Sequence, residues 1–159
     1  MKAGGDNKRA PSMGDEGVGI IAGRFTLKSK DPRFNLLFAE ATRRPPGNTP
    51  SITTVRSVAL SGRQTNTTVG LTRYSQVRYL FSTHPRQTIT FYSSLVGALS
   101  GPAVEAVIAH ELAHAWLNEH VSPDESLKRE READALAREW GFGPELDELD
   151  REAETVNRG

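Results

Sequence analysis

The segment from Ile108 to His114 combines two histidines and a glutamate at a spacing that is typical of metal sites. It reads Ile-Ala-His-Glu-Leu-Ala-His, so His110 and His114 are four residues apart and Glu111 lies between them. Positions four apart share one face of a helix, and two imidazoles placed in this way can bind one metal ion. Glu111 would project beside that face, where it can accept a proton from a metal-bound water. The spacing predicts a hydrolytic metal site.

The sequence around this motif predicts a buried helix. Residues 103–117 are apolar at nearly every position, which is typical of a helix covered on all sides. Burying imidazoles and a carboxylate without partners costs on the order of 1–3 kcal/mol for each unsatisfied group. A bound cation removes that cost, so burial favours a metal site over a chance pair of surface histidines.

A catalytic zinc ion usually has three protein ligands, and the first candidate for the third ligand is Glu130. It lies on the next predicted helix, in the string Glu-Arg-Glu-Ala-Asp that starts at residue 130. The apolar stripe of that helix comprises Ala133, Leu136, Ala137 and Trp140. Glu130 borders one edge of the stripe and Glu132 the other, so helical geometry does not decide which of them is the third ligand. A run of charged residues that only faces solvent would give the same pattern.

The less favoured candidate is His120, which has the spacing of the third histidine in the metzincin motif. That motif needs a glycine where Leu117 stands, because the helix must turn sharply there. Asn118 would turn the chain one place late. His120 is also explained as an exposed residue near a helix C-terminus, where positive charge is favourable.

Taken together, the two strings His-Glu-Leu-Ala-His and Glu-Arg-Glu-Ala-Asp resemble the gluzincin metallopeptidases. They are similar in particular to the CAAX prenyl proteases and the heat-shock HtpX-type proteases, and the resemblance covers residues 88–142. It implies an α+β, zincin-like fold with one Zn²⁺ per chain. The residues that it implies are His110, His114 and Glu130 as zinc ligands, Glu111 as general base and Asp134 as a support of the site. Unlike the prenyl proteases, this chain has no apolar segment long enough to span a membrane.

Length and composition restrict the class of protein further. A chain of 159 residues suits one domain with one core, and its net charge of zero gives no reason to expect nucleic acid as a partner. The absence of cysteine excludes disulfides, thiolate metal sites and cysteine nucleophiles. The N-terminus lacks the hydrophobic stretch of a signal peptide, so we expect a cytoplasmic protein.

Periodicity predicts a small mixed sheet that precedes two ligand-bearing helices. We expect a flexible arm over residues 1–23, a metallopeptidase domain over 24–143 and an acidic helix or tail over 144–159. Strands are predicted at 51–60, 74–81 and 88–92, and a short helix at 34–42. A capping box at Ser122 and Glu125 starts the second ligand-bearing helix, and Gly141 ends it.

The implied substrate is a protein or peptide that binds in an extended form along an edge strand, which we place at Thr88–Tyr92. Candidates for a second oxyanion donor are Tyr74, Tyr79, Tyr92, His84 and Arg138. Three alternatives stay open: a non-catalytic metal- or peptide-binding module on the same fold, a peptidase that acts on a phage- or toxin-system repressor, and autoinhibition by residues 144–159.

Overall fold

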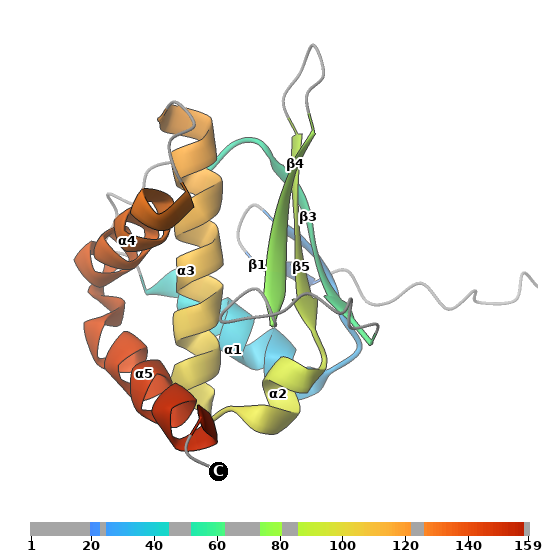
Figure 1. Ribbon diagram of the computed structural model, residues 1–159. Coiled ribbons are helices and arrows are strands. Elements are labelled where there is room, and N and C mark those ends of the chain that lie inside the picture. The colour runs from blue at the N-terminus through green and yellow to red at the C-terminus, as the bar shows by residue number, and fades with distance from the viewer. Residues whose placement is uncertain are drawn as a thin grey trace, which may run out of the picture.

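The structure is a computed structural model that describes residues 20–22, 25–44, 52–62, 74–80, 86–121 and 126–157. It contains a mixed sheet and a set of helices (Figure 1). The strands are β1 (Ile20–Ala22), β2 (Phe25–Lys28), β3 (Val55–Ser61), β4 (Ser75–Leu80) and β5 (Arg86–Tyr92). The helices are α1 (Pro32–Arg43), α2 (Ser94–Ala98), α3 (Gly101–His120), α4 (Ser126–Ala137), the π-helical turn η2 (Arg138–Phe142) and α5 (Gly143–Asn157). The predicted α+β fold is confirmed.

The sheet has the strand order β1-β2-β3-β5-β4. Strands β2, β3 and β5 are parallel, whereas β4 pairs with β5 in the antiparallel direction and lies at one end of the sheet. The prediction that Thr88–Tyr92 is an edge strand is therefore wrong, because β5 has a neighbour on each side. A period of two reports which faces of a strand are buried, but it carries no information about how many neighbours the strand has.

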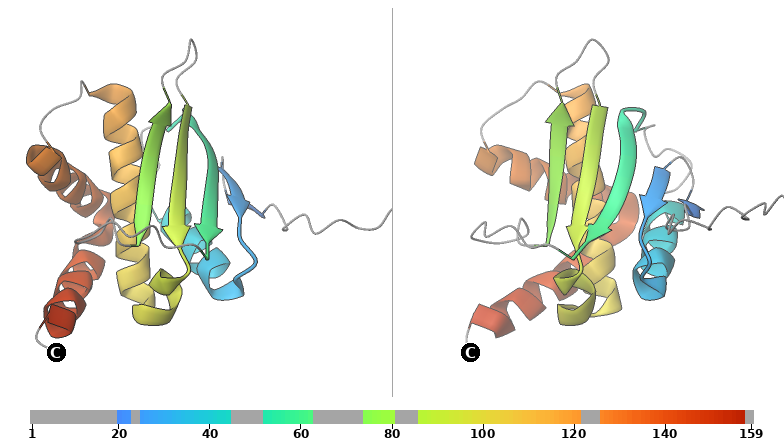
Figure 2. Two further views of the ribbon diagram at one scale, coloured as in Figure 1. Left: turned by 45° about the vertical axis from the view of Figure 1, so that its right-hand side comes forward. Right: turned by 90° about the vertical axis from the view of Figure 1, so that its right-hand side faces the viewer.

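Helix α3 is the centre of the molecule. It lies between the sheet on one side and helices α4 and α5 on the other (Figures 1 and 2). This position explains why most of its residues from Ala103 to Leu117 are buried. On the sheet side the core is aromatic: the ring of Phe34 lies 5.3 Å from that of Phe91 and 6.0 Å from that of Phe38. The all-round apolar pattern correctly predicted a covered helix.

Local capping fixes where the helices begin. The Ser100 side chain accepts a hydrogen bond from the backbone N–H of Ala103 at the start of α3, where Pro102 occupies the first turn. Asp31 caps α1 in the same way, through the N–H of Phe34 at 2.9 Å. The predicted capping box at 122–125 falls outside the described residues.

The predicted strands and the first helix are present with shifted ends. Strands β1 and β2 and helix α2 were not predicted, because three to five residues are too few to show a period. Residues 20–22 form β1 although they fall in the predicted N-terminal arm, and residues 1–19 lie outside the described part. Among the described helices, none combines the length and the apolar character that a membrane crossing requires.

Gly141 lies in η2, the short segment that connects α4 to α5. Its φ of 93° lies in the left-handed region, and a Cβ placed on it would meet nothing within 4 Å. We therefore expect Gly141→Ala to destabilise the fold by about 1 kcal/mol through backbone strain alone, which thermal unfolding would measure. Gly97→Ala is the matched control, because that site is equally open and has no positive φ. Equal melting temperatures for the two variants would contradict this explanation.

Candidate metal centre

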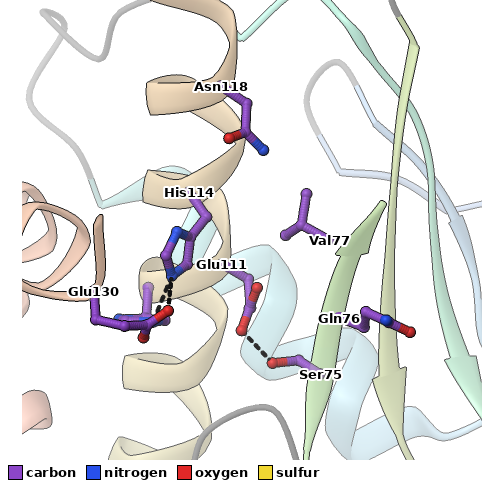
Figure 3. Close-up of a pocket in the computed structure, with 8 residues that line it drawn as sticks. Ser75, Gln76, Val77, Glu111, His114, Asn118 and Glu130 are labelled. Atoms are coloured by element: carbon purple, nitrogen blue, oxygen red, sulfur yellow. Dashed lines mark hydrogen bonds and ion pairs between the residues drawn. The ribbon is translucent and has the colours of Figure 1, made fainter. Parts of the chain in front are cut away.

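Helices α3 and α4 bring together three side chains that could hold a metal ion. The Nε2 atoms of His110 and His114 are 3.0 Å apart. The Glu130 carboxylate reaches both of them, with Oε2 at 3.1 Å from His110 Nε2 and Oε1 at 3.1 Å from His114 Nε2 (Figure 3). One ligand atom from each residue therefore lies within 4.8 Å of the other two. We call these three residues the metal triad.

The triad fits zinc in both chemistry and spacing. Two imidazole nitrogens and one carboxylate oxygen are a ligand set of hydrolytic zinc sites, which leave a fourth position open. Tetrahedral bonds of 2.0–2.1 Å would place ligand atoms about 3.3 Å apart, close to the spacings of 3.0 and 3.1 Å observed here. Two imidazole nitrogens that face each other can share only one proton, so a cation between them is the simplest way to satisfy both.

Asp134 orients the first histidine of the triad. Its Oδ1 lies 2.7 Å from Nδ1 of His110, so an N–H at Nδ1 donates to the carboxylate and the Nε2 lone pair is left for a metal. Burial lowers the pKa of His110, but the hydrogen bonds with Asp134 and Glu130 outweigh it and raise the pKa to about 9 in the metal-free protein. The same imidazoles hold the pKa of the Glu130 carboxyl well below its usual range.

We expect Asp134→Asn to weaken zinc binding about 10–100-fold, because the amide cannot stabilise the Nδ1–H of His110 as a carboxylate does. Competition with a chelator of known zinc affinity would measure the change. Asp147→Asn is the control, since Asp147 is an exposed carboxylate on α5 that pairs with Arg138 at 2.8 Å. A variant at 134 that bound zinc as tightly as the control would show that Asp134 does not support the site.

Glu111 lies beside the triad and is held by the edge strand. The residue is only 5% exposed, and the hydroxyl of Ser75 on β4 donates a hydrogen bond to Oε1 of its carboxylate. Burial raises the pKa of Glu111, although His110 and the hydrogen bond from Ser75 act in the opposite direction. A carboxyl with a raised pKa, close to a candidate metal site, suits proton transfer near neutral pH.

A cleft of about 290 Å³ opens onto the triad between β4 and α3 (Figure 3). Its wall on the sheet side is formed by Ser75, Gln76 and Val77. Its wall on the helix side is formed by His110, Glu111, His114 and Asn118, with Glu130 contributed by α4. The strand that borders the cleft is thus the true edge strand, β4.

Of the candidates for the third ligand, Glu130 is the one that the structure groups with the two histidines. Glu132 faces away from the triad and lies 3.8 Å from Lys128 and 3.9 Å from Arg129. His120 is exposed, its ring stacks on Trp116, and its Nδ1 lies 3.0 Å from the carbonyl oxygen of Trp116. His120 is not grouped with His110 and His114, so the geometry gives no support to a metzincin-like third histidine.

The predicted oxyanion donors are not part of the cleft as described. Tyr74, Tyr92 and Arg138 do not line it, and Arg138 pairs with Asp147 instead. The side chain of Tyr79 and all of His84 fall outside the described residues.

Sequence reasoning missed Ser75 and Asn118 as cleft residues. Helical spacing from His114 could have indicated Asn118, whereas nothing local indicated Ser75.

The C-terminal helix does not cover the cleft. Leu146 and Leu149 of α5 are buried in the core, and Glu152 accepts a hydrogen bond from the N–H of Ser100 at the opposite end of α3 from His120. None of the described residues of α5 lines the cleft. The hypothesis of autoinhibition by residues 144–159 is therefore wrong for the part of that segment that the structure describes.

A comparison with protein families gives one match, to peptidase family M48 over residues 53–129, which is slightly less than half of the chain. The predicted resemblance to gluzincin-type metallopeptidases is confirmed. The matched span runs from the start of β3 to α4 and contains His110, Glu111 and His114. It ends one residue before Glu130, so the assignment of the third ligand depends on the geometry described above. Comparisons with curated proteins and with solved structures give no significant match.

Proposed function

We propose that this protein is a zinc-dependent endopeptidase that binds one Zn²⁺ per chain through His110, His114 and Glu130. The observation that carries the proposal is the position of a buried carboxylate, Glu111, beside three converging ligand atoms and at the wall of a cleft. Zinc bound there would acidify water and polarise the carbonyl group of a peptide bond.

The protein's own residues would supply the proton transfers. Glu111 accepts a proton from the attacking water and passes it to the leaving amine. The raised pKa of its carboxyl makes it a stronger base for the first of these steps. Ser75 holds the carboxylate of Glu111 in place. Asp134 keeps the proton of His110 on Nδ1, so that Nε2 stays available as a ligand.

Strand β4 provides the binding surface that the proposal needs. No described strand pairs with the outer edge of β4, and the same strand lines the cleft through Ser75, Gln76 and Val77. An extended peptide could add to such an edge through main-chain hydrogen bonds, and a peptide bond of it would then lie near Glu111. The proposed substrate is therefore an extended or unfolded segment of a protein.

Removal of zinc should test this function directly. We expect purified protein to cleave unfolded casein at internal peptide bonds, to lose that activity after treatment with 1,10-phenanthroline and to regain it with one equivalent of zinc. Mass spectrometry of the products separates internal cleavage from trimming at the ends. Cleavage that persists after the zinc has been removed would contradict the proposal.

A further inference from the structure

Asn118 is the one residue on the helix wall of the cleft that the proposed reaction does not use. It lies four residues after His114 and seven after Glu111, so all three share a face of α3. Figure 3 shows its amide beyond His114 along the helix, with the nitrogen turned toward the sheet. An asparagine at this position could stabilise the fold through hydrogen bonds, contact a substrate in the cleft, or do both.

The orientation of the Asn118 amide is fixed by a buried glutamine. Gln87 on β5 is fully buried, and its Nε2 donates to the carbonyl oxygen of Ala115 and to Oγ1 of Thr54, each at 2.8 Å. With both donors used, Oε1 of Gln87 can only accept a hydrogen bond. Asn118 must therefore present Nδ2 to it, at 3.1 Å.

This arrangement leaves half of the Asn118 amide for the cleft. One N–H of Nδ2 is given to Gln87, whereas the second N–H and Oδ1 are not used by any described residue. One donor and one acceptor in a single plane are complementary to a peptide group, which also offers one of each. A fixed amide of this kind binds with little loss of side-chain entropy.

The distance along α3 between His114 and Asn118 determines which residue of a bound substrate Asn118 would contact. Four residues of helix correspond to about 6 Å along α3. An extended peptide advances about 3.3 Å per residue, so 6 Å is about two residues. Since β4 and α3 run side by side (Figures 1 and 2), a peptide added to β4 would pass Asn118 at that separation.

We propose that Asn118 binds a main-chain peptide group of the substrate, about two residues away from the bond that is cleaved. The inference depends on the proposed function and makes it more specific. Peptides that extend past Asn118 gain the contact and shorter ones do not. The cleft would therefore favour long, extended substrates irrespective of their sequence.

Peptide binding tests this inference without relying on turnover. The protein would be the zinc-loaded Glu111→Gln variant, and the probes fluorescein-labelled casein peptides of ten residues with nested truncations from each end. We expect an added Asn118→Ala substitution to weaken binding of the long peptides about tenfold, the size expected for one or two neutral hydrogen bonds. The shortest peptides should bind equally to both proteins. Asn118→Leu, which keeps most of the side-chain volume, should behave like Asn118→Ala.

His120→Ala is the matched control, because His120 lies on the same turn of α3 but outside the cleft. It should leave the binding of all peptides unchanged. Equal losses for long and short peptides, or no loss at all, would overturn the inference, as would an absence of binding to any peptide. The proposed function is judged separately by the cleavage of casein by wild-type protein, so the two can fail independently.

Discussion

Glu111→Gln should abolish peptide cleavage and leave the zinc content unchanged. The amide has nearly the shape of the carboxylate but cannot take a proton from water, and general base catalysis typically contributes about 10²–10⁴-fold to the rate. Glu111 is not among the three grouped ligands, so the triad should stay intact. The measurements are the rate of casein cleavage and elemental analysis of the same preparation.

Glu105→Gln is the control for this variant. Glu105 lies on the same helix but pairs with Arg44 at 3.0 Å and does not line the cleft. Its substitution should leave the rate unchanged. If Glu111→Gln cleaved casein as fast as wild type, Glu111 would not be the base. If wild-type protein bound peptides and zinc without cleaving, the non-catalytic module would be the correct interpretation.

Glu130→Ala should lose stoichiometric zinc. The carboxylate is the only ligand of the triad that comes from α4, and its two oxygens lie 3.1 Å from the two histidine nitrogens. Without it, two ligands on α3 remain, one fewer than the three protein ligands usual at a catalytic zinc. The loss of affinity should exceed the 10–100-fold expected for Asp134→Asn, which leaves all three ligands in place. Elemental analysis after dialysis would measure it.

Two variants control for charge and for the rejected ligand. Glu132→Ala removes a carboxylate from the same helix that interacts with Lys128 and Arg129 rather than with the histidines. His120→Ala removes the alternative ligand. Both should retain one zinc per chain. A protein that kept its zinc without Glu130 and lost it without His120 would show that the triad is wrongly assigned.

Local sequence patterns predicted the helix that contains the candidate catalytic residues. His110, Glu111 and His114 share a face because the helical period is 3.6 residues, and the apolar residues around them predicted that the helix is covered. Gly141 also predicted where the following helix ends, and its positive φ agrees with that position. These features depend on residues within a few positions of one another, so local patterns were sufficient.

The contacts between residues of different helices and strands could not be predicted from local patterns, because they depend on how those elements pack. Glu130 and Glu132 border the same apolar stripe, and the rotation of α4 against α3 turned Glu130 toward the histidines. Likewise, pairing between distant strands placed β4 rather than β5 at the edge of the sheet and brought Ser75 to Glu111. Both outcomes depend on how separate elements pack. A periodic pattern states which face of an element is buried, but not which partner buries it.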